Sequence, residues 1–442
     1  MGCRVVRLGD VVQINASQYS AKENWDRIQY LDTGSVVRGS VSGLQQLMPS
    51  RDKVPSRAKR KVKNKSIVYS MVRPNQEHYA LLDNPPSDML VSTGFSVIDA
   101  IETIVSPGYL YYALTAVPVT ERFQALAEQC VSTYPTLSID DLRSLELKLP
   151  DLCTQKKIES LIGAFDKKAK LNARQNDYLD ELRNALVKER ISNALDRGIG
   201  NWRVVPLKDV AKIQSGYSYK SAELVAESSI GMLGIKNFNR NGSFRSDGFK
   251  PLKPEKAKPA QYVALGEIVV AHTDLTQNAD VIGRAIQVID SGGYDQMVAS
   301  LDLVKVASSD DSITNEFLAA LLGTEDFHNH CLGYVNGTTV LHLSKKALSE
   351  YQLKIPEDMA IMSELDDAFK SISQQQAVLI RESRNLERIR DTLLSKLMSG
   401  EIDVSKVELL KQLNNHFDAQ TPSRRKRRLA ARRHTPAART II

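Results

Sequence analysis

The sequence predicts an α+β chain made of two tandem copies of one domain, each followed by a long helix. The segment RVVRLGDVVQINAS at 4–17 returns as RVVPLKDVAKIQSG at 203–216. The end of the unit repeats as well, because LRSLELKLP at 142–150 corresponds to ALSEYQLKIP at 347–356. A stretch of helical character follows each ending. A repeat of roughly 200 residues is the size of a domain and far longer than the repeat of a solenoid.

These markers divide the chain into five segments. We expect a first domain at 1–150, a first long helix at 151–200, a second domain at 201–356, a second long helix at 357–410, and a basic tail at 411–442. The tail is rich in like charge and poor in apolar residues, so it is expected to be disordered.

Short β-rich runs separated by turns predict the α+β character of each domain. The runs are KSIVYSMV (65–72), GFSVIDAI (94–101), GEIVVAHT (266–273) and GRAIQVI (283–289). Asn241-Gly242 and Asn336-Gly337 are strong turn dipeptides. Helices are expected around 109–129 and 312–328.

Apolar residues recur every seven positions in both helical stretches, the pattern of a coiled coil. The repeating positions are Ile158, Phe165, Leu179 and Leu186 with Leu161 and Leu182 on a second seam, and Leu365, Ile372, Leu379, Leu386 and Leu393 with Phe369 and Leu397. Each helix would be roughly 60 Å long, more than a small domain needs internally. We therefore expect the two helices to pair with each other.

Polar residues occupy the middle of both seams. They are Lys168, Asn172 and Gln175 in the first helix, and Gln376, Ser383 and Arg390 in the second. Buried polar seam residues would fix the register of the helices. Alternatively, these positions are exposed because the helices pack only near their ends.

The charge of the chain is concentrated in two places. The net charge is +7, but residues 421–442 alone carry eight basic residues and no acid, so the rest of the chain is close to neutral. A second cluster, RDKVPSRAKRKVKNK at 51–65, suggests a strand edge or loop. Its side chains could neutralise phosphates, or it could be a solvated basic loop.

Several classes of protein are not supported. The first twenty residues lack an apolar signal-peptide core and no run of about 20 apolar residues occurs, so a cytoplasmic protein without membrane association is expected. The four cysteines form no CxxC pair, and FHNHC at 327–331 cannot direct its donors at one metal ion. Asn84-Pro85-Pro86-Ser87 lacks the aromatic residue that a methyltransferase would stack on a flipped adenine. No other catalytic motif is found.

The duplicated unit resembles the DNA-specificity subunit of type I restriction-modification enzymes over residues 1 to about 410. The resemblance rests on the openings RLGDVVQI and PLKDVAKIQSG, on VYSMVRPN followed by STGFSVI, on GEIVVAHTDLT followed by IGRA, and on NGTTVLHLSKKALSEYQLKIP. The basic tail departs from this pattern.

The resemblance implies a fold of two target recognition domains separated by two long helices that form an antiparallel coiled coil with pseudo-twofold symmetry. It also implies that each domain reads one half of a bipartite target in double-stranded DNA while the helices set the spacer. The chain would be non-catalytic. Two modification subunits would supply S-adenosylmethionine chemistry on adenine, and restriction subunits would use ATP and magnesium.

Candidate contacts follow from the chemistry of DNA recognition, in which basic side chains bind phosphates and Arg and Asn pair with guanine and adenine. Phosphate contacts are predicted for Arg57, Lys59, Arg60 and Lys61, and contacts near base edges for Ser70, Arg73, Asn75 and Thr93. In the second domain the candidates are Lys236, Asn237, Asn239, Arg240, Asn241, His272, Thr273, Thr338 and Thr339. Spacer and subunit-binding positions are predicted at Phe165, Leu179, Leu186, Phe369, Leu379, Leu386 and Leu393. The alternative function is a coiled-coil adaptor that pairs two protein-binding domains and never touches DNA.

Overall fold

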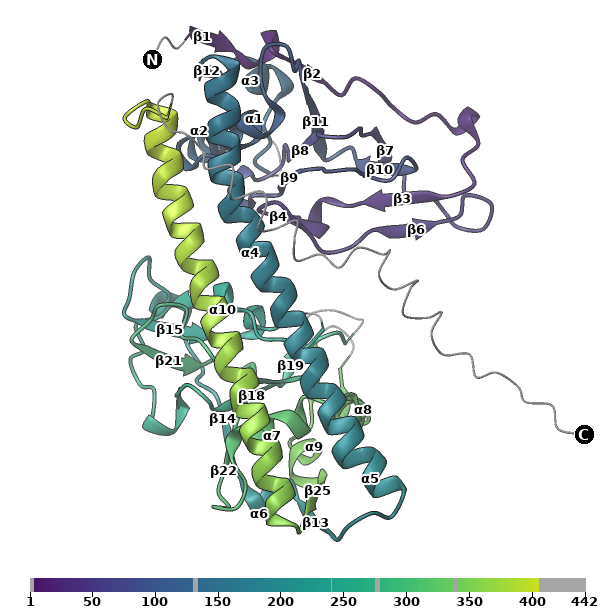
Figure 1. The fold of residues 1–442 in the computed structure, drawn as a ribbon, viewed down its shortest axis with the longest axis vertical. Helices are drawn as coiled ribbons and strands as arrows, with labels where there is room; N and C mark the ends of the chain where they lie inside the picture. Colours follow the sequence, from purple (N-terminus) through teal and green to yellow (C-terminus); the bar gives the residue numbers. More distant parts are fainter. Residues whose placement is uncertain (1–3, 130–133, 240, 275–278, 338–339, 405–442) are drawn as a thin grey trace, which may run out of the picture. The chain divides into compact units, whose positions relative to one another are not determined.

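A computed structural model describes residues 4–129, 134–239, 241–274, 279–337 and 340–404 (Figure 1). The chain forms two compact units, one drawn from residues 1–165 and 389–442 and the other from 166–388. Each unit therefore contains a globular domain together with part of each long helix. Among the described residues, no helix has the length and apolar character needed to cross a lipid bilayer.

The first unit contains two four-stranded sheets, a two-stranded ladder and a short hairpin. One sheet has the order β2 (Val12–Ile14), β11 (Phe95–Ala100), β8 (Ile67–Ser70), β9 (Tyr79–Leu81), and the other β6 (Gln45–Leu47), β3 (Ile28–Leu31), β10 (Met89–Ser92), β7 (Ala58–Lys61). The ladder joins β1 (Arg4–Arg7) to β12 (Glu146–Leu149), and the hairpin joins β4 (Val36–Val37) to β5 (Ser40–Val41).

The second unit repeats this arrangement and adds a three-stranded sheet. Its four-stranded sheets have the orders β14 (Ala211–Ser215), β22 (Leu303–Ser308), β18 (Ile268–Ala271), β20 (Ala285–Gln287), and β16 (Lys250–Pro251), β15 (Ile230–Leu233), β21 (Gln296–Ala299), β17 (Tyr262–Val263). The ladder joins β13 (Trp202–Pro206) to β25 (Gln352–Pro356), and the added sheet is β19 (Thr273–Asp274), β24 (Leu341–Leu343), β23 (Val335–Asn336).

Strand pairing explains why the sequence repeat is clearest at the two ends of each unit. The opening strand of each copy pairs antiparallel with its exit strand, so that Arg4 lies opposite Leu149 and Arg203 opposite Ile355. Both copies also contain a parallel pair, β3 with β10 and β15 with β21, inside an otherwise antiparallel sheet. The duplication thus includes both four-stranded sheets and the ladder, although the sequence reveals it only at the ends.

Short helices cover the sheets of each unit. They are α1 (Pro107–Leu114), α2 (Val117–Glu128) and α3 (Ile139–Arg143) in the first unit, and α6 (Leu207–Val210), α7 (Asn315–Leu322), α8 (Glu325–Leu332) and α9 (Lys345–Glu350) in the second. The helix expected around 312–328 is therefore two helices, because the chain leaves α7 at Gly323 and Thr324 caps the start of α8.

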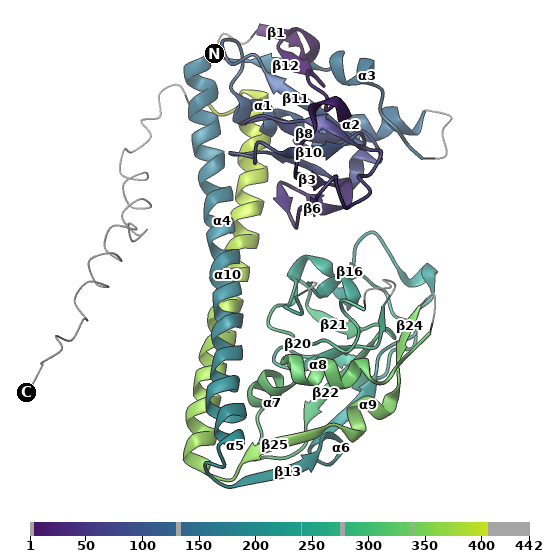
Figure 2. The ribbon, with the colours of Figure 1, turned by 90° about the vertical axis from the view of Figure 1, so that its right-hand side faces the viewer.

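Two long helices complete the structure (Figure 2). Helix α4 (Leu152–Val187) continues through a π-helical turn (Lys188–Ser192) into α5 (Asn193–Asp196), and α10 spans Met359–Ser399. In the first unit, Ile158 and Ile162 of α4 share one core with Leu394 and Leu397 of α10. In the second unit, the end of α4 and the start of α10 pack on the same core, which contains Val187 and Phe369. The predicted pairing of the two helices is confirmed.

Polar contacts show that the helices run antiparallel within the second unit. Asn172 is fully buried, and its Nδ2 donates to Glu382 Oε2 at 2.9 Å and to Ser383 Oγ at 3.2 Å. Further along α4, Asp180 accepts from Gln376 Nε2 at 2.9 Å. The partner's residue number falls as that of α4 rises, which defines the antiparallel direction.

The seam contains both of the arrangements that the sequence left open. Asn172 and Gln376 are buried and bonded between the helices, whereas Gln175 is exposed. Leu182 was expected on the seam but is 48% exposed, so that prediction is wrong. A straight α-helix drifts away from a strict seven-residue repeat, which moves this late seam position out of the interface.

Candidate functional site

Three segments of the first unit meet beside the end of β8. Met71 donates its N–H to Gly94 O at 3.1 Å, and its own carbonyl accepts from Leu137 at 2.7 Å. Next to Gly94, Thr93 donates its N–H to Arg57 O at 2.9 Å. Backbone hydrogen bonds thus gather residues that lie far apart in the sequence. We call the resulting surface, made by residues 71–75, 93–94 and 134–137, the first platform.

The first platform displays a cation and an amide. Arg73 is exposed, and its guanidinium carbon lies 4.8 Å from the centre of the Tyr134 ring. Such a cation–π contact orients the flat guanidinium without neutralising its charge. Asn75 is also exposed and anchors its backbone N–H to Gln124 Oε1 at 3.1 Å. Both side chains can therefore reach a ligand at this surface.

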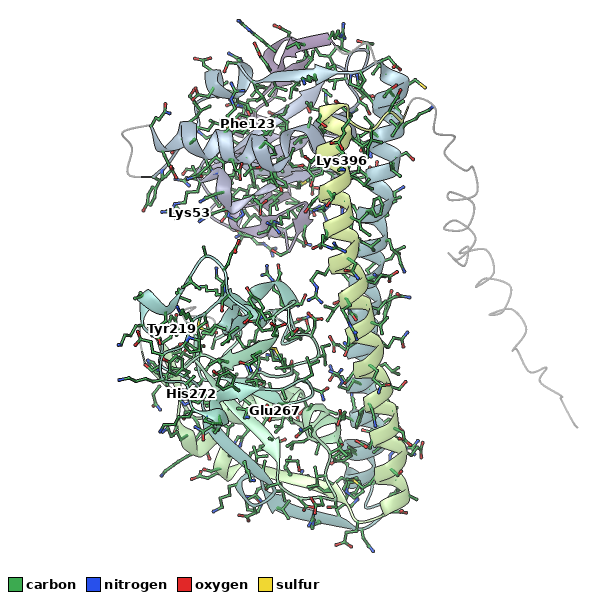
Figure 3. The ribbon with its side chains drawn as sticks, turned by 90° about the vertical axis from the view of Figure 1, so that its left-hand side faces the viewer. Lys53, Phe123, Tyr219, Glu267, His272 and Lys396 are labelled. Carbon is green, nitrogen blue, oxygen red and sulfur yellow. The ribbon has the colours of Figure 1, made fainter. Side chains whose placement is uncertain are left out.

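The predicted phosphate contacts line β7, an edge strand of its sheet. Arg57 and Lys59 are exposed, and the exposed Lys53 lies in the segment that leads into the strand (Figure 3). Arg60 is partly buried, and burial lowers its pKa. Its Nη1 atom has no hydrogen-bond partner among the described residues. Arg57 and Lys59 are consequently better placed for phosphate binding than Arg60.

Lys61 already has partners inside the domain. It forms an ion pair with Glu23, and its Nζ lies 5.2 Å from the centre of the Trp25 ring. The hydrogen bond from Lys61 is the main cause that lowers the pKa of Glu23. The structure thus gives Lys61 a role in holding β7 against residues 23–25.

The second unit builds the same scaffold from different residues. His272 takes the place of Met71: its N–H donates to Asp302 O at 2.7 Å, and its carbonyl accepts from Leu343 at 2.9 Å. The next residue of each copy also corresponds: Thr273 forms a strand pair with His342, and Val72 forms a β-bridge with Thr136. We call residues 272–274, 301–302 and 341–343 the second platform.

The chemistry of the second platform differs from that of the first. His272 (Figure 3) is partly buried, and its pKa is lowered by burial first and then by His342 and Lys345. Its Nε2 is buried and has no hydrogen-bond partner within the described part of the chain. Thr273 is buried and donates its hydroxyl to Asp302 Oδ1 at 2.9 Å. The second platform thus carries an imidazole at the position that Met71 occupies in the first platform.

Three predicted base contacts are buried in structural roles. Ser70 donates its hydroxyl to Val72 O at 3.0 Å, and Thr273 is bonded to Asp302. Asn237 is 0% exposed and bridges the backbone of Gly234 and Arg245 at 3.0 Å each. None of the three is positioned to contact DNA, because each hydroxyl or amide is occupied locally.

The turn that follows Asn237 is partly accessible. Lys236 and Asn241 are exposed, and Asn239 is half-buried. The Asn239 amide donates to Ser243 Oγ at 2.8 Å, and Asn241 Oδ1 accepts from the same hydroxyl at 2.7 Å. These asparagines shape the turn as well as facing its surface. Arg240, Thr338 and Thr339 lie outside the described residues.

The long helices bury or partly bury the predicted spacer and subunit-binding positions and expose a different stripe. Phe369 is fully buried against Phe317, and Leu379 is buried. Partly buried side chains fill the remaining predicted positions, which are Phe165, Leu179, Leu186, Leu386 and Leu393. By contrast, α4 exposes Leu171, Tyr178 and Leu182, three large apolar side chains that recur at helical spacing on one face.

Sequence reasoning missed Tyr134, Asp302 and His342. The signal for them was the strand equivalence of β8 with β18 and of β11 with β22, which becomes visible only through pairing. No group of three or more His, Cys, Asp or Glu side chains within the described residues is arranged to hold a metal ion.

Known proteins share the organisation of this chain. The family described as "Type I restriction modification DNA specificity domain" matches residues 2–181 and again residues 199–381. The HindI type I restriction enzyme specificity subunit of Haemophilus influenzae is 25% identical over 467 aligned positions, covering 89% of this chain and 98% of the relative. The MjaVIII specificity subunit of Methanocaldococcus jannaschii is 24% identical and covers 71% and 75%.

Two solved structures also align with most of this chain. The type I restriction-modification S subunit from M. genitalium has 17% identity and a TM-score of 0.49, covering 90% of this chain and 96% of that one. The HsdS subunit from Thermoanaerobacter tengcongensis has 19% identity and a TM-score of 0.38, covering 91% and 97%. Because the family matches both units, the chain belongs to the type I restriction-modification DNA specificity family, whose members are the non-catalytic targeting subunits of their systems.

Proposed function

We propose that each platform reads one half of a bipartite site in double-stranded DNA. The observation that carries this proposal is the repeated backbone scaffold around Met71 and His272, on which the two copies place different side chains. Backbone hydrogen bonds hold a surface in place, while exposed side chains can then differ in donors and acceptors. Two domains with the same backbone scaffold but different exposed side chains are suited to two different half-sites.

The first half-site would be contacted by Arg73 and Asn75, with Arg57 and Lys59 on phosphates. Arginine and asparagine can pair bidentately with guanine and adenine in the major groove, and each good pair discriminates by about 1–3 kcal/mol. The second half-site would be contacted by Lys236, Asn239 and Asn241, which are exposed or half-buried.

The helix pair would set the spacer and dock two modification subunits. The antiparallel register is fixed by buried polar contacts such as that between Asn172 and Glu382. The exposed stripe Leu171, Tyr178 and Leu182 offers an apolar surface for a partner. We place S-adenosylmethionine on the modification subunits, and ATP and magnesium on restriction subunits, in the cytoplasm. This chain would supply no cofactor site.

The decisive experiment maps methylated adenines genome-wide with and without this chain, and repeats the reaction with purified components. We expect no methyl transfer by the chain alone and methylation of one bipartite motif when two modification subunits are added. Methyl transfer by the isolated chain would refute the non-catalytic role.

The adaptor alternative is not favoured by the family match, and DNA binding tests it directly. Salt-dependent DNA binding that survives removal of residues 421–442 would reject an adaptor that never touches DNA. Loss of all binding with the tail would instead reject DNA reading by the platforms.

Docking on the helices has its own test. Tyr178→Arg should weaken association with modification subunits, because it places a charge in the exposed stripe. Leu265→Arg, at a side chain that is 61% exposed in the globular part of the second unit, should not. Equal association of both variants would contradict the assignment of the stripe.

A further inference from the structure

The first unit contains a hairpin whose function the sequence does not suggest. Strands β4 and β5 pair Val37 with Ser40 across the two residues Arg38 and Gly39. Both turn residues have positive φ, 45° and 78°. This is the geometry of a type I′ turn, which glycine favours and arginine rarely adopts. An arginine held at the tip of a tight turn is projected outward by the backbone.

The second unit contains an equivalent hairpin at the same place in the fold. In both units the hairpin follows the first strand of the parallel pair and one 3-10 turn, Thr33–Ser35 or Ile235–Asn237. The second hairpin is closed by a bridge between Phe238 and Phe244, and its Gly242 has a φ of 81°. The sequence of the first hairpin contains Arg38-Gly39-Ser40 and that of the second Arg240-Asn241-Gly242-Ser243, of which Arg240 lies outside the described residues.

The first hairpin is anchored to the segment that carries Arg73 and Asn75. Arg38 donates its N–H to Glu77 O at 2.9 Å, and Gly39 donates to Tyr79 O at 2.8 Å. The Nδ1 atom of His78 forms a hydrogen bond with the Val36 carbonyl, and its Nε2 atom lies 3.1 Å from Gln76 Oε1. The hairpin is thus part of one surface with the first platform.

The same anchor position is used in the second unit. Arg284 corresponds to His78, because their carbonyls accept from the last residues of β18 and β8, at 3.0 and 2.8 Å respectively. A Cβ on Gly242 would lie 2.9 Å from Arg284 Cδ, so the arginine stem packs directly beneath the hairpin. Arg284 is itself fixed by an ion pair with Glu325. Both copies therefore support the hairpin from one structural position.

We propose that the 36–41 hairpin is a DNA phosphate-binding element and that Arg38 makes the contact. This inference rests on the proposed function. Two domains that read different half-sites both have a hairpin at this place with an arginine in its sequence, so the hairpin is suited to the part of DNA that both half-sites have in common, which is the phosphate backbone. The Arg38 side chain is 63% exposed and forms an ion pair with Glu77. An exposed ion pair of this kind is weak, so a phosphate can replace the carboxylate.

The test compares Arg38→Gln with a matched control, Arg27→Gln. Arg27 has a 57% exposed side chain and pairs with Asp88 at 2.6 Å. It lies before the start of β3, whereas the hairpin follows the end of that strand. Both changes remove one positive charge and break one surface ion pair. Binding is measured with the complete modification complex, on a duplex carrying the methylated motif and on a scrambled duplex, over a range of NaCl concentrations.

We expect Arg38→Gln to weaken binding to both duplexes by a similar factor, about 5–20-fold at low salt, and to lower the slope of log K against log salt by about 1. Arg27→Gln should match the wild type. Glu77→Gln should bind at least as tightly as wild type, because it releases Arg38 without removing it.

Three results would overturn the inference while leaving the proposed function intact, provided the wild-type complex prefers its motif. The first is DNA binding by the Arg38→Gln variant that equals that of the wild type. The second is a loss of binding confined to the motif duplex, which would indicate a base contact. The third is an equal loss of binding in Glu77→Gln, which would indicate that the ion pair only stabilises the structure. A wild-type complex with no preference for the motif would refute the proposed function, and the inference with it.

Discussion

Replacing Asn172 by alanine tests whether a buried amide holds α4 against α10. Its Nδ2 donates to Glu382 Oε2 at 2.9 Å and to Ser383 Oγ at 3.2 Å, and the side chain is fully buried. Hydrogen bonds to charged groups contribute about 1.5–3 kcal/mol. Glu382 is 41% exposed and keeps Lys168 at 3.2 Å, so water and lysine compensate for part of the loss. We expect unfolding of the second unit to become easier by about 1–2 kcal/mol.

The two tryptophans make this measurable for one unit at a time. The chain contains only Trp25 and Trp202, one in each unit. In a Trp25→Phe background, fluorescence during urea titration follows Trp202, which packs on the core that contains Phe369 of α10. Changes in the urea midpoint at constant slope then report the stability of the second unit.

Asn172→Leu is the matched variant that separates polar contact from packing. The Oδ1 atom of Asn172 is buried without a hydrogen-bond partner among the described residues, so a leucine of similar size removes an unpaired polar atom. We expect Asn172→Leu to be more stable than Asn172→Ala, and to methylate sites with altered spacers if register is relaxed. Wild-type stability of Asn172→Ala, or a leucine variant weaker than the alanine one, would refute this account.

Three further outcomes are expected. Phe369→Ala should destabilise the second unit by about 3–5 kcal/mol, seen in the same urea titration, because the ring is fully buried; a loss under about 1 kcal/mol would contradict its core position. Burial lowers the pKa of His272 below its usual 6.5, so as the pH falls the unfolded chain binds a proton before the folded chain does, and the stability of the fold should decrease as the pH drops through 6.5. His272→Gln should reduce this pH dependence between pH 7.5 and 5.5. An unchanged dependence in the variant would contradict the role of His272. Arg57→Gln and Lys59→Gln should each lower the salt slope of DNA binding by about 0.9, whereas Ser70→Ala, whose hydroxyl is bonded locally, should leave binding unchanged; equal effects in all three would refute the phosphate assignment.

The sequence predicted the features that depend on periodicity. The tandem copies follow from the repeated segments, the strands around 65–72 and 266–273 from β-rich runs between turns, and the paired helices from apolar residues at seven-residue spacing; the structure confirms these elements. The prediction that Leu182 lies on the seam was wrong, because the position of a late heptad residue depends on the accumulated twist of the helix.

The candidate contacts were harder to predict because burial of a polar side chain depends on partners distant in the sequence. Ser70 and Asn237 have the residue types of base contacts, yet each is occupied by nearby backbone atoms. Tyr134 could not be connected with Arg73 at all, since 60 residues and several strands and helices lie between them. Only tertiary structure brings such residues to one surface.

The structure also explains how two copies can differ in sequence while keeping one fold. At both platforms the defining hydrogen bonds are made by backbone atoms, those of Met71 and Gly94 in one copy and of His272 and Asp302 in the other. Backbone donors and acceptors are the same for every residue except proline, so side chains at these positions can change without loss of the scaffold. Residues that contact a common phosphate would face the opposite constraint, because their charge must be kept. The different side chains at the platforms and the arginine in the sequence of both hairpins are therefore two consequences of one division of labour between base reading and backbone binding.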